Sequence, residues 1–314
     1  MIGEGTAEGF DALTLGAGDA GLEVAFVPEA GMVGCSLTHR GEEVLGQRGG
    51  LSAYIEKRST MGIPLLYPWA NRLGSARFSV AGREVDLECA APAPKLDRGG
   101  LPIHGLLTAA ADWEVDRHAA SDDGGVLAAS FDFGAERGLL GGFPFPHELS
   151  LEATLAGPTL TIATRVHASG GAQVPVAFGY HPYFCLPGVP RAEWELEAPV
   201  GERLRLDDRM LPTGEREPAS VEAGPLGSRT FDDGYGAPDD GAPFVLSGGG
   251  RRIEVTFGDG YEFAQIYAPA GQDLIAFEPM TAPTNALVSG DDLPLVEPGE
   301  SYEATFSVSI TDTS

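Results

Sequence analysis

The stretch LSLEATL, residues 149–155, places an apolar side chain at every second position. Ala156-Gly157-Pro158 follows it, and apolar residues return at positions 160, 162, 163 and 166. An alternation with a period of two puts apolar side chains on one face of an extended chain, which is typical of a β-strand with one buried face. A glycine and a proline between two such stretches favour a turn. We therefore predict a β-hairpin over residues 149–166.

The same alternation recurs along the chain, and helical periodicity is nearly absent. It is found at residues 78–87, 113–128, 252–267 and 302–310. GAGDAG at 16–21 has the letters of a dinucleotide-binding loop, but a strand pattern, LEVAFV, follows it where that loop needs a helix. We interpret these glycines as a hairpin turn. Many short strands joined by turns predict an all-β protein, either a sandwich or a barrel.

Length and composition favour one domain over residues 1–314. A single β-sandwich commonly reaches about 200–250 residues, and no change of composition marks a boundary in this chain. Two stretches with little periodicity, 51–71 and 232–250, are expected to be long loops. The second is the best candidate for a linker, but similar strand patterns flank it, which favours a surface loop.

Charge and cysteine content exclude several classes of function. The formal net charge is −26 and the pI is near 4.4, so a nucleic acid would be repelled over the whole surface. Cys35, Cys89 and Cys185 lie far apart without a CxxC pair, which indicates reduced thiols in a cytoplasmic protein. The N-terminus lacks a signal-peptide pattern, and no run approaches the roughly 18 apolar residues of a membrane span. Metal-ligand spacings are missing too, so we expect neither a membrane partner nor a metal site.

His181 lies in the aromatic run AFGYHPYF, residues 177–184. Proline disfavours the helical region for the residue before it, so His181 is expected on extended backbone between Tyr180 and Tyr183. Its unperturbed pKa of about 6.5 suits a proton donor near neutral pH. The two tyrosines could form an apolar platform for a sugar ring. A structural histidine at a strand end is the alternative interpretation.

Glu278 ends the apolar run LIAF, residues 274–277, and precedes Pro279. A carboxylate at the mouth of a buried strand is destabilising unless it is paired or used. Burial would raise its pKa, and a protonated histidine nearby would lower it again. Glu278 and His181 held together would provide a general base and a general acid. A carboxylate that turns to solvent at the strand end is the alternative.

Further polar residues lie in loop or apolar contexts. Asn71 and Arg72 follow a rigid aromatic segment and offer an amide and a guanidinium, which suit hydroxyl oxygens. His104 precedes Gly105, which permits close backbone approach, and Asp232 stands at a predicted loop start. The alternatives are a surface ion pair for Arg72, a structural role for His104 and turn chemistry for Asp232.

Five blocks of the sequence resemble the aldose 1-epimerase (galactose mutarotase) family, in that family's order and across most of the chain. They are YPWANRLG (67–74), HG (104–105), GYHPYF (179–184), FDDGY (231–235) and FEPMTAPTNAL (277–287). The resemblance implies the large antiparallel β-sandwich of the galactose mutarotase-like proteins, the supersandwich, which agrees with the strand pattern. It also implies an enzyme that interconverts the α and β anomers of an aldose without a cofactor.

The resemblance implies a role for each matching residue. Glu278 would be the general base that removes the proton of the anomeric hydroxyl, and His181 the acid that protonates the ring oxygen. Rotation in the open aldehyde and reclosure would then interconvert the anomers. Tyr180 would be a neighbour of the site. The residues that would hold sugar oxygens and steady the developing charge are His104, Asn71, Arg72, Asp232 and Gln265.

One departure leaves the substrate open. His104 is followed by Gly105-Leu106-Leu107, and not by the double glycine common after this histidine in galactose mutarotases. Hexose 6-phosphates, the substrates of some relatives, would need basic residues at the site. The chain has only 20 lysines and arginines, which favours a neutral aldose.

Two other classes of function are kept as alternatives. A carbohydrate-binding β-sandwich without turnover would not need an acid and base pair. A glycoside-processing enzyme would need two carboxylates across the scissile bond, for which only Asp232 stands beside Glu278. The oligomeric state is not predicted.

Overall fold

The computed structural model describes residues 1–110, 113–238 and 240–313. Strands dominate the described part of the chain, and its large sheets are built from antiparallel pairs. The prediction of an all-β, antiparallel protein is confirmed. The prediction of a single domain stays a prediction.

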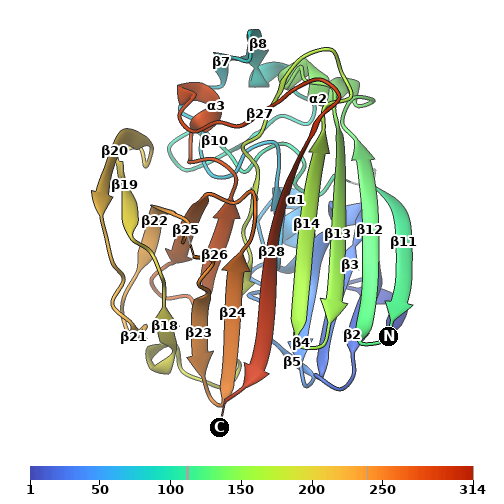
Figure 1. Ribbon diagram of the computed structural model, residues 1–314, viewed down its shortest axis with the longest axis vertical. Coiled ribbons are helices and arrows are strands. Elements are labelled where there is room, and N and C mark those ends of the chain that lie inside the picture. The colour runs from blue at the N-terminus through green and yellow to red at the C-terminus, as the bar shows by residue number, and fades with distance from the viewer. Residues whose placement is uncertain (111–112, 239, 314) are drawn as a thin grey trace.

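A nine-stranded sheet forms one layer, and the predicted hairpin 149–166 lies within it (Figure 1). In spatial order its strands are β11 (Glu114–Ser121), β12 (Gly124–Asp132), β13 (Glu148–Ala156), β14 (Thr159–His167), β28 (Ser301–Asp312), β24 (Arg251–Phe257), β23 (Phe244–Gly248), β18 (Glu195–Glu197) and β21 (Gly224–Pro225).

Two further sheets complete the layers. The eight-stranded sheet runs through β20 (Pro212–Pro218), β19 (Glu202–Leu206), β22 (Phe231–Gly236), β25 (Phe263–Ala268), β26 (Ile275–Met280), β16 (Gly179–Tyr180) and β6 (Leu65–Leu66), and β17 (Tyr183–Phe184) pairs with β26 off this path. The five-stranded sheet comprises β1 (Ile2–Ala7), β2 (Phe10–Ala17), β3 (Leu22–Val27), β4 (Val33–His39) and β5 (Glu42–Glu43).

Short elements connect these sheets. Three strand pairs are β7 (Arg77–Val80) with β8 (Arg83–Asp86), β9 (Lys95–Leu96) with β10 (Pro102–Ile103), and β15 (Val174–Pro175) with β27 (Leu295–Val296). The helices are α1 (Gly50–Lys57), α2 (Arg137–Gly142) and α3 (Ala286–Ser289), with 3₁₀ turns η1 (Pro28–Ala30), η2 (Leu87–Cys89) and η3 (Arg191–Glu193). Within the described ranges, every helix is too short or too polar to cross a membrane.

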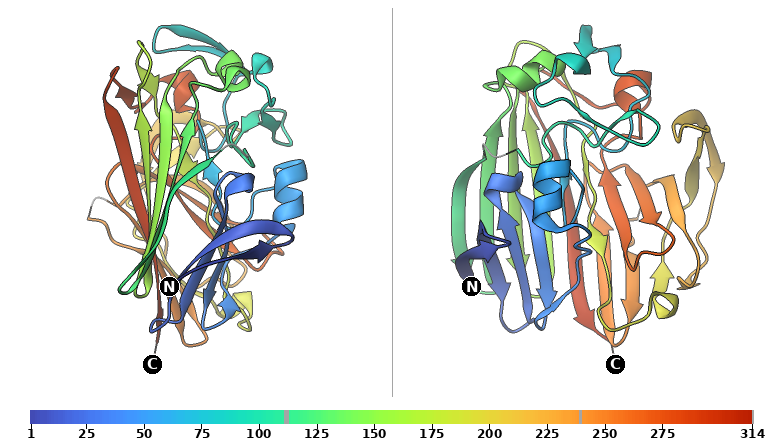
Figure 2. Two further views of the ribbon diagram at one scale, coloured as in Figure 1. Left: turned by 90° about the vertical axis from the view of Figure 1, so that its right-hand side faces the viewer. Right: turned by 180° about the vertical axis from the view of Figure 1, so that it is seen from behind.

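The nine-stranded sheet packs one face against the other two sheets. Phe244 of β23 stacks on Phe277 of β26 with 5.4 Å between the ring centroids. The ring centroids of Tyr180 of β16 and Phe306 of β28 are 5.0 Å apart. Strand β2 contacts β12 and β13 within the same buried cluster. Figure 2 shows the layers edge-on in its left view. Apolar burial between these layers is the main source of stability, and the predicted sandwich is confirmed.

The hairpin prediction holds with one correction. Strands β13 and β14 pair over their whole length, with Leu149 opposite Val166. Ala163 is not on the buried face, because Thr164 takes the core position in this register. The Thr164 hydroxyl lies 2.7 Å from the hydroxyl of Tyr180. A buried polar side chain is tolerated there because it has a hydrogen-bond partner.

The glycines at 16–21 form the predicted turn, since Ala17 at the end of β2 pairs with Leu22 at the start of β3. The two predicted loops were partly wrong. Helix α1 takes up the start of the first, and β22 and β23 occupy about half of the second. The segment FDDGYG of β22 lacks a strand pattern in the sequence because it mixes acidic residues and glycines. It is a strand because it pairs with β25 along its whole length.

Two connections of the first third of the chain lie side by side and carry Asn71 and His104. The backbone N–H of His104 donates to the carbonyl of Asn71 at 3.0 Å. Both residues have positive φ angles, 55° and 62°. Gly105 follows at φ 73° and bridges to Tyr67. A Cβ at Gly105 would collide with the backbone carbonyl of Tyr67, so only glycine fits there.

We expect Gly105→Ala to destabilise the protein by more than about 3 kcal/mol, because it adds a backbone collision to the strain of a positive φ. Gly82 in the β7–β8 turn is the matched control: its φ is 71° and a Cβ there would meet no atom within 4 Å. Gly82→Ala should therefore lose only about 1–2 kcal/mol. Urea denaturation of both variants measures the difference, and equal losses would contradict the packing argument.

Candidate active site

A cavity of about 630 Å³ opens beside the eight-stranded sheet and gathers six of the seven predicted site residues. These six are Asn71, Arg72, His104, His181, Asp232 and Glu278. Gln265, the seventh, is buried next to the cavity and donates to Asp232. Residues from five separate stretches of the chain are thus brought to one place.

His181 lies between β16 and β17, where its backbone N–H donates to the carbonyl of Pro64 at 3.2 Å. Its Nε2 lies 3.1 Å from Oε1 of Glu278 and 3.1 Å from the hydroxyl of Tyr183. The imidazole also stacks on the Tyr183 ring, with 4.1 Å between centroids and 19° between planes. These contacts fix the position of the ring while Nε2 points at the carboxyl group.

Glu278 is inside β26, where every residue is buried, and is itself only 2% exposed. The prediction that it ends its strand was wrong, because Pro279 continues the strand and pairs with Ala264 of β25. Gln265 stands opposite Glu278 in the same ladder. Oε2 of Glu278 makes no hydrogen bond within the described part of the chain. The carboxyl group therefore has one free oxygen in a buried position.

Burial shifts the pKa values of this pair in opposite directions. The pKa of Glu278 is raised well above its usual value, first by burial and then by the negative charge of Asp232. The pKa of His181 is lowered well below its usual value, first by burial and then by the neighbouring His104 and Arg48. Both effects disfavour the charged forms. A carboxylate in this place would be a strong base, and an imidazolium a strong acid.

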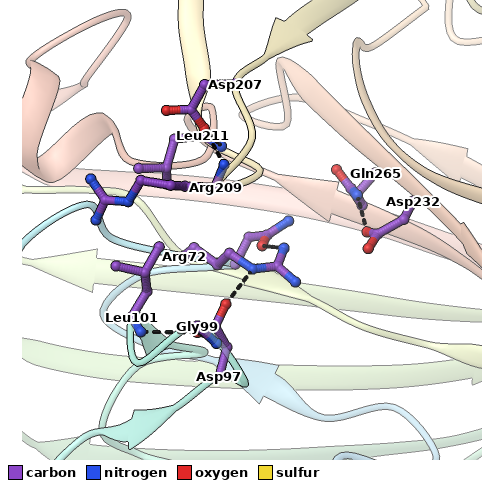
Figure 3. Close-up of polar contacts among 10 residues, drawn as sticks. Arg72, Asp97, Gly99, Leu101, Asp207, Arg209, Leu211, Asp232 and Gln265 are labelled. Atoms are coloured by element: carbon purple, nitrogen blue, oxygen red, sulfur yellow. Dashed lines mark hydrogen bonds and ion pairs between the residues drawn. The ribbon is translucent and has the colours of Figure 1, made fainter.

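The pairing of Arg72 and Asp232 with other side chains is shown in Figure 3. Nε of Arg72 donates to Asp97 at 2.8 Å, and one terminal nitrogen donates to the side chain of Asn71 at 3.0 Å. Nε2 of Gln265 donates to Asp232 at 2.8 Å. Burial raises the pKa of Asp232, and the charge of Arg72 opposes this. Arg72 does make the ion pair considered from the sequence, but at a half-buried position on the cavity wall.

His104 approaches His181 edge-on, with 5.6 Å between the ring centroids. Its pKa is lowered to about 3 by burial, followed by the positive charges of Lys95, Arg72 and Arg48. The ring is therefore neutral at neutral pH, with one nitrogen that donates and one that accepts. Its Nδ1 is buried and has no hydrogen-bond partner among the described residues. Such a ring is suited to a neutral hydroxyl group.

The two tyrosines that flank His181 have different places. Tyr183 lines the cavity and contacts His181, as the platform hypothesis requires. Tyr180 does not: its ring lies in the core beside Phe306, and its hydroxyl bonds to Thr164. Side chains alternate between the two faces of an extended chain. Tyr180 and Tyr183 are three positions apart, an odd number, so they point to opposite faces.

A comparison with known protein families adds to this geometry. The profile of the family described as aldose 1-epimerase matches residues 13–309 of this chain. The chain belongs to the aldose 1-epimerase family. The family predicted from the five sequence blocks is confirmed.

Relatives and solved structures agree with this family. The uncharacterized protein YihR of Escherichia coli K12 is 24% identical over 254 residues, which cover 78% of this chain and 77% of that protein. A galactose mutarotase-like protein from Clostridium acetobutylicum has a TM-score of 0.84 at 18% identity, covering 100% and 99% of the two chains. The galactose 1-epimerase from Lactobacillus acidophilus NCFM has a TM-score of 0.77 at 15% identity, covering 100% and 99%. At these identities the structural likeness shows the shared fold.

This member of the aldose 1-epimerase family has further cavity residues that the sequence analysis missed. Those that bear charged or hydroxyl groups are Arg48, Thr60, Lys95, Asp97, Arg98 and Tyr267. Most stand in connections with little periodicity, so no local pattern marks them. One signal was available for Lys95, which is one of only two lysines in the chain.

The raised pKa of Glu278 predicts a change in stability when the group is made neutral. A group whose pKa is higher in the folded than in the unfolded state contributes stability below its unfolded pKa and loses it as the pH rises. We expect Glu278→Gln to be more stable than the wild type at pH 8 by about 0.5–2 kcal/mol. The difference should shrink towards about pH 4.

Thermal unfolding at both pH values measures this effect. Glu152→Gln, an exposed substitution in β13, is the matched control and should change stability by less than about 0.5 kcal/mol. A Glu278→Gln variant less stable than the wild type at pH 8 would show that an ion pair with His181 stabilises the fold instead.

Proposed function

We propose that this protein is an aldose 1-epimerase in which Glu278 and His181 exchange protons with a bound aldose. The observation that carries the proposal is the 3.1 Å approach of Nε2 of His181 to Oε1 of Glu278 in a buried corner of the cavity. An acid and a base at one point can act on two oxygens attached to the same carbon, which is the chemistry of an anomeric centre.

In the first half of the reaction, the Glu278 carboxylate takes the proton of the anomeric hydroxyl. The electron pair left on that oxygen forms the carbonyl double bond, and the bond between C1 and the ring oxygen breaks. The His181 imidazolium donates its proton to the ring oxygen as it leaves. The products are an open-chain aldehyde, a carboxylic acid and a neutral imidazole, so one proton has entered the sugar and one has left it.

In the second half, the aldehyde rotates about the bond between C1 and C2, and the same steps run backwards on its other face. The pair returns to its starting protonation state, so no other reactant is required. Each positioned acid or base typically accelerates such a step by about 10²–10⁴-fold. The opposite pKa shifts support these roles, because they make the carboxylate a stronger base and the imidazolium a stronger acid.

The remaining predicted residues would position the sugar. Asn71 and Arg72 present an amide and a guanidinium to the cavity, and Asp232 presents a carboxylate that Gln265 holds in place. Neutral His104 stands beside His181 and would bind a hydroxyl near the anomeric carbon. Holding the sugar ring in one orientation lowers the entropic part of the reaction barrier, because the reacting atoms are already next to the acid and the base.

We expect anomer exchange to be lost when either member of the pair is replaced. Saturation-transfer NMR at anomeric equilibrium measures the exchange for glucose, galactose, xylose and glucose 6-phosphate. On the best of these substrates, Glu278→Gln and His181→Asn should each lower the enzyme-dependent rate by about 100-fold or more. The surface substitutions Glu152→Gln and His167→Asn are matched controls and should stay within about twofold of the wild type.

Other outcomes of this experiment point to other functions. Binding of a sugar without any exchange would replace the proposal by a carbohydrate-binding sandwich. Release of the aryl group from an aryl glycoside, dependent on Asp232 and Glu278, would replace it by glycoside hydrolysis.

The pKa shifts also predict the pH dependence of kcat/KM. In the active state, Glu278 and His181 together hold one exchangeable proton. Because the pKa of His181 is lowered, the pair takes up a second proton only well below pH 6.5. Because the pKa of Glu278 is raised, the pair loses its one proton only well above pH 4.5. The rate should therefore fall in acid with a midpoint well below pH 6.5, and in alkali with a midpoint well above pH 4.5. Exchange NMR from about pH 4 to about pH 10 checks this, and an acid limb centred at pH 6.5 would contradict it.

A further inference from the structure

Basic side chains outnumber carboxyl groups in the lining of the cavity, whereas acidic residues predominate in the whole chain. The sequence has 46 acidic and 20 basic residues. Nevertheless, four basic side chains line this cavity: Arg48, Arg72, Lys95 and Arg98. The carboxyl groups that face them are Asp97, Asp232 and Glu278. Four of the 20 basic residues of the chain thus line one cavity.

Only one of the four basic groups is neutralised by a close partner. Arg72 pairs with Asp97 at 2.8 Å. Arg48, Lys95 and Arg98 form no ion pair among the residues that the structure describes. These three groups are free to bind an anion.

Neutral partners hold two of the free groups in place. Arg48 donates to the Thr60 carbonyl at 3.1 Å and to the hydroxyl of Tyr183 at 2.8 Å, and its guanidinium lies over the Tyr183 ring. Nζ of Lys95 donates to the carbonyl of Arg58 at 2.7 Å. Burial, followed by the charges of Arg48 and Arg58, lowers the pKa of Lys95. The basic groups therefore repel one another, and an anion would relieve this repulsion.

We propose that the aldose taken by this cavity carries an anionic substituent, bound by Arg48, Lys95 and Arg98. This inference rests on the proposed epimerase function and names its substrate class. The chemistry required is a phosphate, a sulfate or sulfonate, or a carboxylate. Guanidinium and ammonium groups bind such anions through short, charge-assisted hydrogen bonds.

The position of Arg48 indicates where on the sugar the anion lies. Arg48 donates to the Tyr183 hydroxyl, which in turn lies 3.1 Å from Nε2 of His181. In the proposed reaction, His181 acts on the ring oxygen. That oxygen is bonded to the carbon from which the exocyclic carbon of a hexose projects. An anion on the exocyclic carbon would therefore lie within reach of Arg48.

The basic side chains near His181 would also link the charge of the substrate to the protonation of this histidine. The positive charges of Arg48 and Lys95 add to the burial that lowers the pKa of His181. An anion bound between them would offset these charges and favour the imidazolium form. A charged substrate would thus help to protonate the residue that opens its ring, and a neutral aldose would not.

The position of these residues argues against the neutral aldose that the composition favours. The low number of basic residues in the chain speaks against a charged sugar only if those residues are spread over the surface. Composition counts the groups in a chain and says nothing about where they meet. Here three arginines and one of the two lysines meet at a single cavity.

Exchange NMR on matched sugars tests the inference. The panel is glucose, glucose 6-phosphate, glucose 6-sulfate and glucuronate, and the quantity compared is kcat/KM for each charged sugar relative to glucose. We expect at least one charged sugar to be preferred by about 10-fold or more. The anion that gives the highest ratio identifies the substituent.

Lys95→Gln and Arg98→Gln should each lower this ratio by about 10-fold, since each removes one charge-assisted contact. Lys57→Gln and Arg117→Gln are the matched controls: both residues are exposed, on α1 and β11, and neither lines the cavity. They should leave the ratio within about twofold of the wild type. The preference should also weaken in high salt, because exposed charges are screened.

The outcomes separate this inference from the proposed function. Exchange of glucose at least as fast as that of every charged sugar, with a ratio unaffected by Lys95→Gln and Arg98→Gln, would overturn the anionic subsite and leave the epimerase standing. If no sugar is exchanged, calorimetry with glucose 6-phosphate decides. Binding that both variants weaken would support the subsite without the epimerase, and failure to bind would overturn both.

Discussion

The contact between His181 and Glu278, made away from water, is the constraint on which the site depends. Two ionisable groups at 3.1 Å remain in a buried place only if the surrounding structure holds them there. The nine-stranded sheet and the apolar core provide this support from behind, because β26 is buried along its whole length. The pair is thus a local destabilisation offset by apolar burial elsewhere, as is common at catalytic sites.

Regular strands and irregular connections contribute different residues to the cavity. Paired strands position Glu278 and Asp232, and a short link between β16 and β17 positions His181. Connections carry Asn71 and His104, whose positive φ angles a regular strand could not supply. Arg48, Arg72 and Arg98 also stand in connections outside the strands and helices.

Prediction from the sequence succeeded where a local pattern or a short motif specifies the structure or the family. The alternation in 149–166 identified a hairpin, and the blocks around His104, His181 and Glu278 identified the family. It failed where pairing decides the structure. FDDGYG became strand β22 because β25 lies beside it, and the polar Thr164 is tolerated in the core because the hydroxyl of Tyr180 is its hydrogen-bond partner. These outcomes depend on neighbours that are distant in the chain.

The sequence by itself determined the strand-rich fold, the family and six residues that line one cavity, because alternation and short motifs are properties of neighbouring positions. The tertiary structure alone decided which charges meet. It placed Tyr183 in the cavity and Tyr180 in the core. It also brought Arg48, Lys95 and Arg98 to the wall of that cavity in a strongly acidic protein. Electrostatic interactions act through space and weaken with distance, so their effect follows from where the fold places each charge and not from how many the chain contains.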